Sequence, residues 1–267
     1  MHLRKTILFI SAALTLISSA CKDDPVPKEK GNIIVLMYHK ITQSEASNLY
    51  ERSVADFEDD LIYLINNNIR VISFNDLEEI KKSGAMPDGH AAIITFDDGD
   101  RSGYDLVLPL LRKYQMKATF FLWVEKIDQN TYFTSSEVKT MSNYMLPGGT
   151  RPFTFGSHGF THQYLMARKE TFATDEEYNT FLDYELGESK RVIQLLTPDD
   201  VNCFSLPFGD GAGDSEIISA VQRNGYSYIR TSIHEAIKDP AINLFEIPAV
   251  AILDKTQNDE IGYYLEH

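Results

Sequence analysis

The sequence predicts an α/β fold built around a parallel sheet that is closed or nearly closed, and three observations support that prediction. Short apolar runs alternate with segments of helical periodicity along most of the chain, as strands joined by crossover helices do. The apolar runs show little alternation with polar residues, which is typical of strands buried on both faces. Chemically reactive side chains follow directly after several of these runs, and in barrel folds that end of each strand carries the active site.

The first predicted strand is the apolar run at 33–38, which ends at His39. A helix at 54–67 follows, because its apolar residues recur at helical spacing and Ser53 can cap its first turn. The remaining predicted elements are, in chain order, a strand at 70–74, a helix at 75–82, a strand at 91–96, a helix at 103–114, a strand at 118–123, a short helix capped at 134–137, a strand at 153–156, a helix at 175–196, a strand at 203–206, a helix at 214–224, and strands at 226–230 and 245–248.

The bulk properties limit the class of protein. At 267 residues the chain suits one large domain or two small ones. Its hydrophobic fraction of 43% and charged fraction of 24% are typical of a globular protein. A net charge of −14 argues against nucleic acid or an anionic polymer as the main partner. It suits a neutral or cationic substrate, although an acidic surface can serve solubility alone.

Residues 1–21 have the pattern of a secretory signal peptide. Two basic residues precede the apolar run at 7–17, and small residues lead into Cys21, as at a bacterial lipoprotein cleavage site. The next three residues, Lys-Asp-Asp, resemble the acidic signal that sends some lipoproteins of Bacteroidetes-type bacteria to the cell surface. Residues 22–31 read as a Pro- and charge-rich tether, followed by one domain at 32–267. We expect an exported lipoprotein held in the bacterial outer membrane through lipid on Cys21, with display at the cell surface as an open alternative.

The second cysteine, Cys203, then has no partner for an internal disulfide. Its neighbours in the chain are mostly apolar, so the sequence predicts a buried structural thiol there and not a nucleophile.

Two adjacent aspartates, Asp97 and Asp98, follow the apolar run at 91–96. Neighbouring carboxylates repel each other, so the pair makes sense where a cation holds one and catalysis uses the other. Further along the chain, His158 and His162 stand four residues apart. One aspartate and two imidazoles form a three-ligand set that leaves coordination positions open, as a hydrolytic metal site requires. This set favours zinc, and cobalt or nickel would also fit.

These motifs resemble those of the polysaccharide deacetylases of the NodB-homology type, carbohydrate esterase family 4. Thr-Phe-Asp-Asp-Gly at 95–99 matches the first motif of that family, and the two histidines match the second. The resemblance covers about residues 32–267 and implies a distorted (β/α)7-type barrel. It also implies that Asp97 is the catalytic base and that Asp98, His158 and His162 hold a divalent metal.

The stretch Leu-Pro-Phe-Gly at 206–209 resembles the third motif of the family. It makes the backbone N–H of Phe208, after Pro207, a candidate donor to the oxyanion of the reaction. A purely structural turn is the alternative. Ser205 stands where the motif usually has an arginine. Because that arginine commonly pairs with the base, the sequence leaves open what orients Asp97.

The amine leaving group needs a proton, and a histidine is the natural donor near neutral pH. Met-Tyr-His at 37–39 resembles the start of the exported poly-N-acetylglucosamine deacetylases, where this function is carried early in the chain. His39 is therefore the predicted general acid, with the late His234 and the terminal His267 as alternatives.

Aromatic residues near the motifs could line a sugar groove, since aromatic faces stack on pyranose rings. Core packing is the better prediction for Trp123, because it ends a strongly apolar run. Tyr164 and Phe160 flank the histidines, and for them both interpretations stay open, with Tyr164 as the candidate contact to substrate.

The resemblance implies removal of N-acetyl groups from N-acetylglucosamine units of a polysaccharide such as poly-β-1,6-N-acetylglucosamine, chitin or peptidoglycan. One alternative is an O-acetyl esterase of the same fold that acts on a plant polysaccharide such as xylan. A catalytically silent carbohydrate-binding homologue is another.

Overall fold

The computed structural model describes residues 29–267. The predictions for the signal peptide, Cys21 and residues 22–28 of the tether lie outside the described residues. No helix among the residues from 29 onward is long and apolar enough to cross a membrane.

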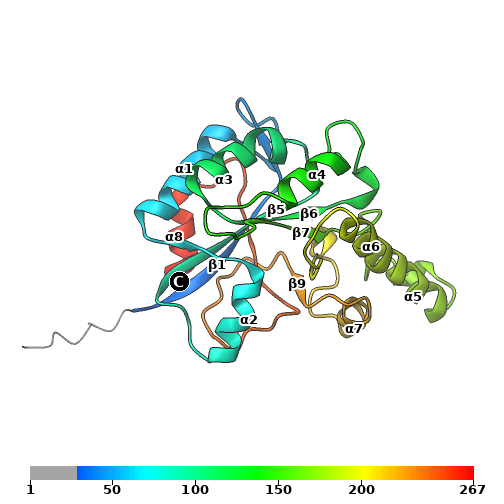
Figure 1. Ribbon diagram of the computed structural model, residues 1–267. Coiled ribbons are helices and arrows are strands. Elements are labelled where there is room, and N and C mark those ends of the chain that lie inside the picture. The colour runs from blue at the N-terminus through cyan, green and yellow to red at the C-terminus, as the bar shows by residue number, and fades with distance from the viewer. Residues whose placement is uncertain (1–28) are drawn as a thin grey trace, which may run out of the picture.

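Eight parallel strands form one curved sheet with the order β10-β1-β5-β6-β7-β8-β9, and β4 lies beside the start of β5 (Figure 1). The strands are β1 (Lys30–Tyr38), β4 (Arg70–Val71), β5 (Gly89–Phe96), β6 (Ala118–Leu122), β7 (Phe153–Ser157), β8 (Cys203–Ser205), β9 (Tyr228–Arg230) and β10 (Val250–Ala251). A separate pair joins β2 (Lys40–Thr42) to β3 (Glu51–Ser53).

Helices cover the convex face of the sheet, and α2 lies on the opposite side of the central strands (Figure 1). The helices are α1 (Val54–Asn66), α2 (Phe74–Ser83), α3 (Leu108–Tyr114), α4 (Ser135–Ser142), α5 (Asp175–Asp183), α6 (Ser189–Gln194), α7 (Ser215–Arg223) and α8 (Asn258–Glu266). Two π-helical turns, η1 (Gly103–Val107) and η4 (Tyr184–Glu188), lead into α3 and join α5 to α6. The prediction of one long helix at 175–196 is thus confirmed with a π-turn in its middle.

The central strand β1 shows why its sequence is apolar throughout. Ile34 and Leu36 pack in the larger core beneath the outer helices, while Ile33 and Val35 pack in the smaller core on the concave side. All four side chains are at most 1% exposed. Burying such a side chain contributes about 1.5–3 kcal/mol, so both faces of the strand stabilise the fold.

The sheet closes only partly, because β9 and β10 stand at its two ends and do not pair. The segment at 231–249 runs between them, where Ile33 and Ile237 exchange backbone hydrogen bonds of 2.9 and 2.7 Å. The architecture is therefore a half-barrel, and the predicted α/β class with a nearly closed parallel sheet is confirmed.

The end of the chain differs from the prediction. The expected strand at 245–248 is wrong: it makes a single parallel bridge, Arg230 to Ile247, and Pro248 has no N–H to extend the pairing. The last strand is instead β10, which pairs with β1 at Leu36. Helix α8 was not predicted at all, although its buried residues Ile261 and Leu265 pack in the larger core.

Candidate active site

Reactive side chains from several strands meet at the carboxyl ends of the sheet. His39 follows β1, Asp97 and Asp98 follow β5, and His158 follows β7. Adjacent parallel strands in register bring these ends together, as the pairing of Tyr38 with Phe96 shows for β1 and β5. All four of these side chains, together with His162, line one cavity of about 450 Å³.

Asp98, His158 and His162 direct their ligand atoms at one point. Oδ1 of Asp98 lies 3.6 Å from Nε2 of His158 and 3.5 Å from Nε2 of His162. All three ligand atoms lie within 4.8 Å of one another. In a tetrahedral zinc site with bonds of about 2.0–2.1 Å, ligand atoms are about 3.3–3.4 Å apart. The donor set and its spacing therefore fit a divalent metal.

Hydrogen bonds to other parts of the chain orient both imidazoles. Nδ1 of His158 lies 2.9 Å from the carbonyl oxygen of Ser205 and donates to it in the tautomer that leaves Nε2 free for a metal. Glu185 on η4 holds the segment between the two histidines. Oε2 of Glu185 accepts hydrogen bonds of 2.9 Å from the backbone N–H groups of Phe160 and Thr161. The buried carboxylate thus fixes the loop that carries His162.

The backbone is strained at three residues of the site. Asp98 has φ 68°, His162 has φ 56° and Phe208 has φ 58°. Non-glycine residues rarely adopt this left-handed region, which costs about 1–3 kcal/mol unless the surroundings impose it. All three residues line the cavity, so the strained positions fall at the residues that form the site.

Asp97 is 2% exposed and is held by a cation that the sequence analysis missed. Nη2 of Arg230 donates both to Oδ2 of Asp97 and to Oγ of Ser205. Burial raises the pKa of Asp97, but the charge of Arg230, with His158 and His39, outweighs burial and places that pKa below the usual value. Asp97 is therefore an anion beside the three candidate ligands, 3.7 Å from Nε2 of His158.

Burial lowers the pKa of two imidazoles of the cavity, those of His162 and His39. Burial, and then repulsion from His158, lowers the pKa of His162 to about 4, so this imidazole is neutral near pH 7 and can act as a ligand. Burial also lowers the pKa of His39, and the nearby carboxylates of Asp97 and Asp98 partly offset it. Nδ1 of His39 is buried and has no hydrogen-bond partner in the described part of the chain, and the ring of His39 lies 5.2 Å from that of Tyr50.

Aromatic rings surround His162. Trp123 stacks on its imidazole with ring centroids 4.7 Å apart and planes 24° apart, so the prediction of core packing for Trp123 is wrong. The chain turns at this residue, which follows β6, and the indole points to the site and not into the core. On the other side, Phe208 lies 4.6 Å from His162 and stacks on Tyr164 at 4.2 Å. Phe160 packs on Tyr184, away from this group.

The outer rim of the site is apolar. Phe208 and Tyr164 are 55% and 48% exposed, and Tyr50 is 56% exposed. Exposed rings beside a cavity can stack on sugar rings. Pro207 is buried and begins the 3₁₀ turn η5 (Pro207–Gly209), so the predicted turn exists and carries Phe208 at the cavity.

The two late histidines have different positions. His234 lines the cavity, so it stays an alternative to His39. His267 does not, because α8 runs away from the strand ends. Its last turn lies against the start of β1, where Asn32 donates a hydrogen bond of 2.7 Å to the carbonyl oxygen of Leu265.

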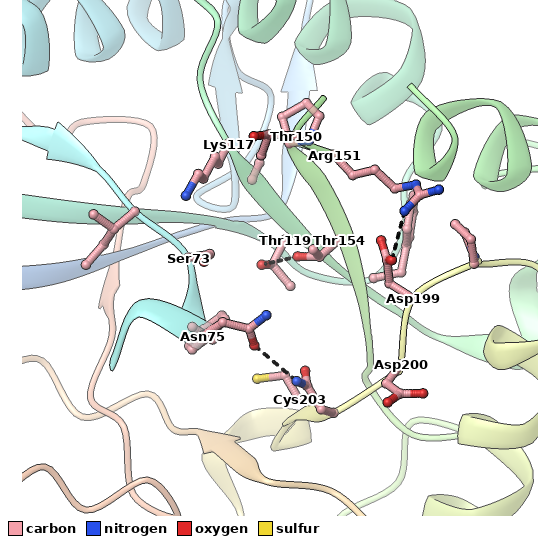
Figure 2. Close-up of a pocket in the computed structure, with 17 residues that line it drawn as sticks. Ser73, Asn75, Lys117, Thr119, Thr150, Arg151, Thr154, Asp199, Asp200 and Cys203 are labelled. Carbon is pink, nitrogen blue, oxygen red and sulfur yellow. Dashed lines mark hydrogen bonds and ion pairs between the residues drawn. The ribbon is translucent and has the colours of Figure 1, made fainter. Parts of the chain in front are cut away.

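A larger cavity, of about 610 Å³, opens at the opposite ends of the strands (Figure 2). Figure 2 shows Thr119 and Thr154 side by side in its wall, joined by a hydrogen bond of 2.8 Å, and Arg151 paired with Asp199 at its edge. The thiol of Cys203 lies in its wall, and burial raises its pKa well above 9, as the prediction of an inert structural thiol requires. The smaller cavity is the candidate site because it alone of the two contains the candidate metal ligands.

The fold and the site define a barrel-type hydrolase. The chain belongs to the polysaccharide deacetylase family, whose profile matches residues 85–229. Poly-β-1,6-N-acetyl-D-glucosamine N-deacetylase of Staphylococcus epidermidis is 22% identical over 272 residues, which cover 92% of this chain and 92% of that protein.

Solved structures show the same fold. The Streptococcus pyogenes deacetylase PplD in complex with acetate matches with a TM-score of 0.75 and 18% identity, over 90% of this chain and all (100%) of that chain. IcaB from Ammonifex degensii matches with a TM-score of 0.70 and 19% identity, over 89% and 97% of the two chains. The predicted distorted barrel of the NodB-homology type is confirmed, and the protein is a polysaccharide deacetylase.

Proposed function

We propose that this deacetylase hydrolyses the N-acetyl groups of N-acetylglucosamine units in a polysaccharide, and that it depends on a divalent metal. One observation carries the proposal: Asp98, His158 and His162 converge on one point while the neighbouring Asp97 is drawn aside by Arg230. The named activity of the staphylococcal relative supports the choice of substrate. The net charge of −14 agrees with it, because the product carries free amines that an acidic surface attracts.

Asp98, His158 and His162 would hold the metal, with zinc favoured by the ligand set and cobalt or nickel as alternatives. A bound divalent ion lowers the pKa of water and polarises a carbonyl oxygen, which is the chemistry that amide hydrolysis at neutral pH needs. The residues of the chain supply positioning and proton transfer.

Asp97 is the proposed general base. Its Oδ2 is taken by Arg230, whereas its Oδ1 is buried and has no hydrogen-bond partner among residues 29–267. Oδ1 is therefore the atom placed to accept a proton from the attacking water. The carboxylate can accept it because Arg230 keeps Asp97 ionised near neutral pH.

Water attack forms a C–O bond to the acetyl carbon, and the C–N bond then breaks to give acetate and a free amine. The backbone N–H of Phe208, on a strained turn at the cavity, would donate to the developing oxyanion. His39 would give a proton to the leaving nitrogen, and its position after β1 places it in the same cavity as Asp97. Tyr164, stacked on Phe208, would contact a sugar ring.

A panel of substrates tests this function. We expect the protein to release acetate from N-acetylglucosamine oligomers with β-1,6 or β-1,4 links, or from peptidoglycan fragments, and to lose this activity with a chelator. Re-addition of zinc, cobalt or nickel should restore it. Release from acetylated xylan but from none of the N-acetylated substrates would contradict the proposal and favour an O-acetyl esterase.

We also propose that the protein is an exported outer-membrane lipoprotein with the lipid on Cys21. The basic, apolar and small-residue pattern before Cys21 supports this proposal. Metabolic labelling with a fatty-acid analogue should label the wild-type protein in the membrane fraction. A Cys21→Ala protein that is labelled equally would contradict it.

A further inference from the structure

Arg230 is a charged residue in a place where charge is costly. It ends the buried strand β9, is 1% exposed, and follows Tyr228 and Ile229, which are equally buried. A guanidinium removed from water is tolerated when an anion and further hydrogen bonds compensate its charge. The anion is Asp97, whose Oδ2 accepts from Nη2.

The rest of the guanidinium is fixed from other directions. Nη1 donates to the carbonyl oxygen of Thr231 at 3.3 Å and contacts Sδ of Met37 at 2.6 Å. The ring of Phe121 lies 5.3 Å from the guanidinium carbon. Nε is buried and has no partner among the described residues, so the head of Arg230 is held through Nη1, Nη2 and the aromatic face, and it holds Oδ2 of Asp97 in turn.

Ser205 completes this arrangement from the neighbouring strand. It is the register partner of Arg230 in the parallel pair β8 and β9, and its hydroxyl accepts from the same Nη2. Its Oγ also lies 3.4 Å from Oδ2 of Asp97. Paired residues of parallel strands point to the same face, and the small side chain of Ser205 leaves the space that the long side chain of Arg230 fills.

We propose that Arg230 is the positioning residue for Asp97, and that Ser205 and Arg230 act as one unit across the β8–β9 pair. This inference rests on the proposed function, because it assigns Arg230 an effect through the base. Arg230 occupies Oδ2, so Oδ1, which has no hydrogen-bond partner among the described residues, is the oxygen left to take a proton. The arginine that position 205 lacks is thereby replaced by one from the next strand.

The first test compares Arg230→Lys and Arg230→Met with the wild type, using acetate release from an N-acetylglucosamine oligomer. A base displaced by about 1 Å costs about 100-fold in rate, so we expect Arg230→Met to lower kcat by about that factor. Arg230→Lys, which keeps a charge without the planar fork, should retain more kcat than Arg230→Met. KM and the bound zinc per protein should stay near wild-type values, because neither substrate contacts nor ligands change.

Arg52 gives a matched control. It is 2% exposed and pairs with the buried Asp60 through Nε at 2.6 Å and Nη2 at 2.7 Å, outside the cavity. Arg52→Lys should lower the melting temperature and leave kcat unchanged. An Arg230→Lys protein that behaves in the same way, less stable but fully active, would overturn the inference.

A double-mutant cycle with Asp97→Asn decides whether Arg230 acts through the base. We expect Arg230→Met to cost about 100-fold in kcat when Asp97 is present and less than about 3-fold in the Asp97→Asn protein. Equal losses in both backgrounds would overturn the inference while leaving the proposed function intact. If Asp97→Asn alone kept wild-type kcat, the proposed function would fail instead.

If Arg230→Met does not fold, exchanging the residues at positions 205 and 230 provides a second test. The protein with both Ser205→Arg and Arg230→Ser keeps one buried guanidinium beside Asp97. Its kcat should exceed that of Arg230→Ser by about 10-fold or more if the two positions share one function. If the doubly substituted protein folds but is no more active than Arg230→Ser, the two positions do not act as one unit.

Discussion

Glu185 accepts two hydrogen bonds from Thr161, one from its N–H at 2.9 Å to Oε2 and one from its hydroxyl to Oε1. The carboxylate is 1% exposed and lies on the π-turn η4, a widened turn that moves it out of the regular helix toward the loop between the histidines. Its Oε2 also accepts from the N–H of Phe160. A residue distant from the motifs therefore determines where His162 stands.

Glu185→Gln should weaken metal binding. Both carboxylate oxygens accept hydrogen bonds, and an amide can supply only one acceptor oxygen, so its NH₂ group would face a donor. Loss of such support to metal ligands typically costs about 10–100-fold in affinity. Zinc affinity measured by competition with a chelator checks this. Glu188→Gln is the control. Glu188 lies on the same turn, is partly exposed and pairs with Arg191, so this variant should keep wild-type affinity for zinc. Equal affinities in all three proteins would contradict the role of Glu185.

Tyr164→Ala should raise KM for polymeric substrate. The ring is half exposed and stacked on Phe208, so it is held ready to receive a sugar face. Aromatic stacking is worth about 0.5–1.5 kcal/mol, which corresponds to about 2–12-fold in KM. Steady-state kinetics on an oligomer provides the measurement. Tyr263→Ala, at an exposed tyrosine on α8 that stacks on His267, should leave KM unchanged. A Tyr164→Ala protein with wild-type KM would show that no sugar ring stacks there.

Glu51 should stabilise the protein in a defined pH window. A hydrogen bond from Lys40, with further hydrogen bonds from the N–H and hydroxyl of Ser47, lowers the pKa of Glu51 from 4.5 to about 2. A carboxylate with a lowered pKa in the folded state stabilises that state above the pKa of the unfolded chain, and this contribution disappears as the pH falls toward the folded-state value.

Above pH 5, the melting temperature of the wild type should therefore exceed that of Glu51→Gln by a few degrees. This difference should shrink as the pH falls below about 4.5 and vanish near pH 2. Thermal melting curves across this range measure it. A difference that stays constant from pH 6 to pH 2.5 would exclude the ionised carboxylate as its source.

Asp98→Asn should remove metal binding and activity without unfolding the chain. The side chain of Asp98 is 34% exposed, so a neutral amide there leaves no buried charge unpaired. Loss of the charged Asp98 ligand should lower kcat by about 100-fold or more. Bound zinc, kcat and the melting temperature are measured on the same sample. Retained zinc with unchanged kcat would contradict the assignment of Asp98 as a ligand.

The sequence predicted the parts of the fold that have a strong local signal. The run at 33–38 is apolar on both faces because β1 separates two cores, and that property can be seen without a structure. Helix α8 was missed because it begins without a Ser, Thr, Asp or Asn cap and has only two buried residues. The strand expected at 245–248 failed because apolar residues there fill the gap in the half-barrel without forming a ladder.

The site was predictable where its residues stand close together in the chain. Asp97 and Asp98 are adjacent, and the two histidines lie four residues apart, so local motifs expose them. Arg230 and Glu185 were missed because they reach the site from other elements. Each did leave a signal. Arg230 is a lone charge in a buried strand, and Glu185 falls at helical spacing between the buried Leu182 and Ser189.

Crystals of the protein soaked in zinc, measured at wavelengths on either side of the zinc absorption edge, show whether Asp98, His158 and His162 hold one metal ion. We expect one strong anomalous peak about 2.0–2.2 Å from Oδ1 of Asp98 and from Nε2 of His158 and His162, with the Asp97 carboxylate beside it and not bound to it. A peak elsewhere, or none at these three side chains, would contradict this metal site.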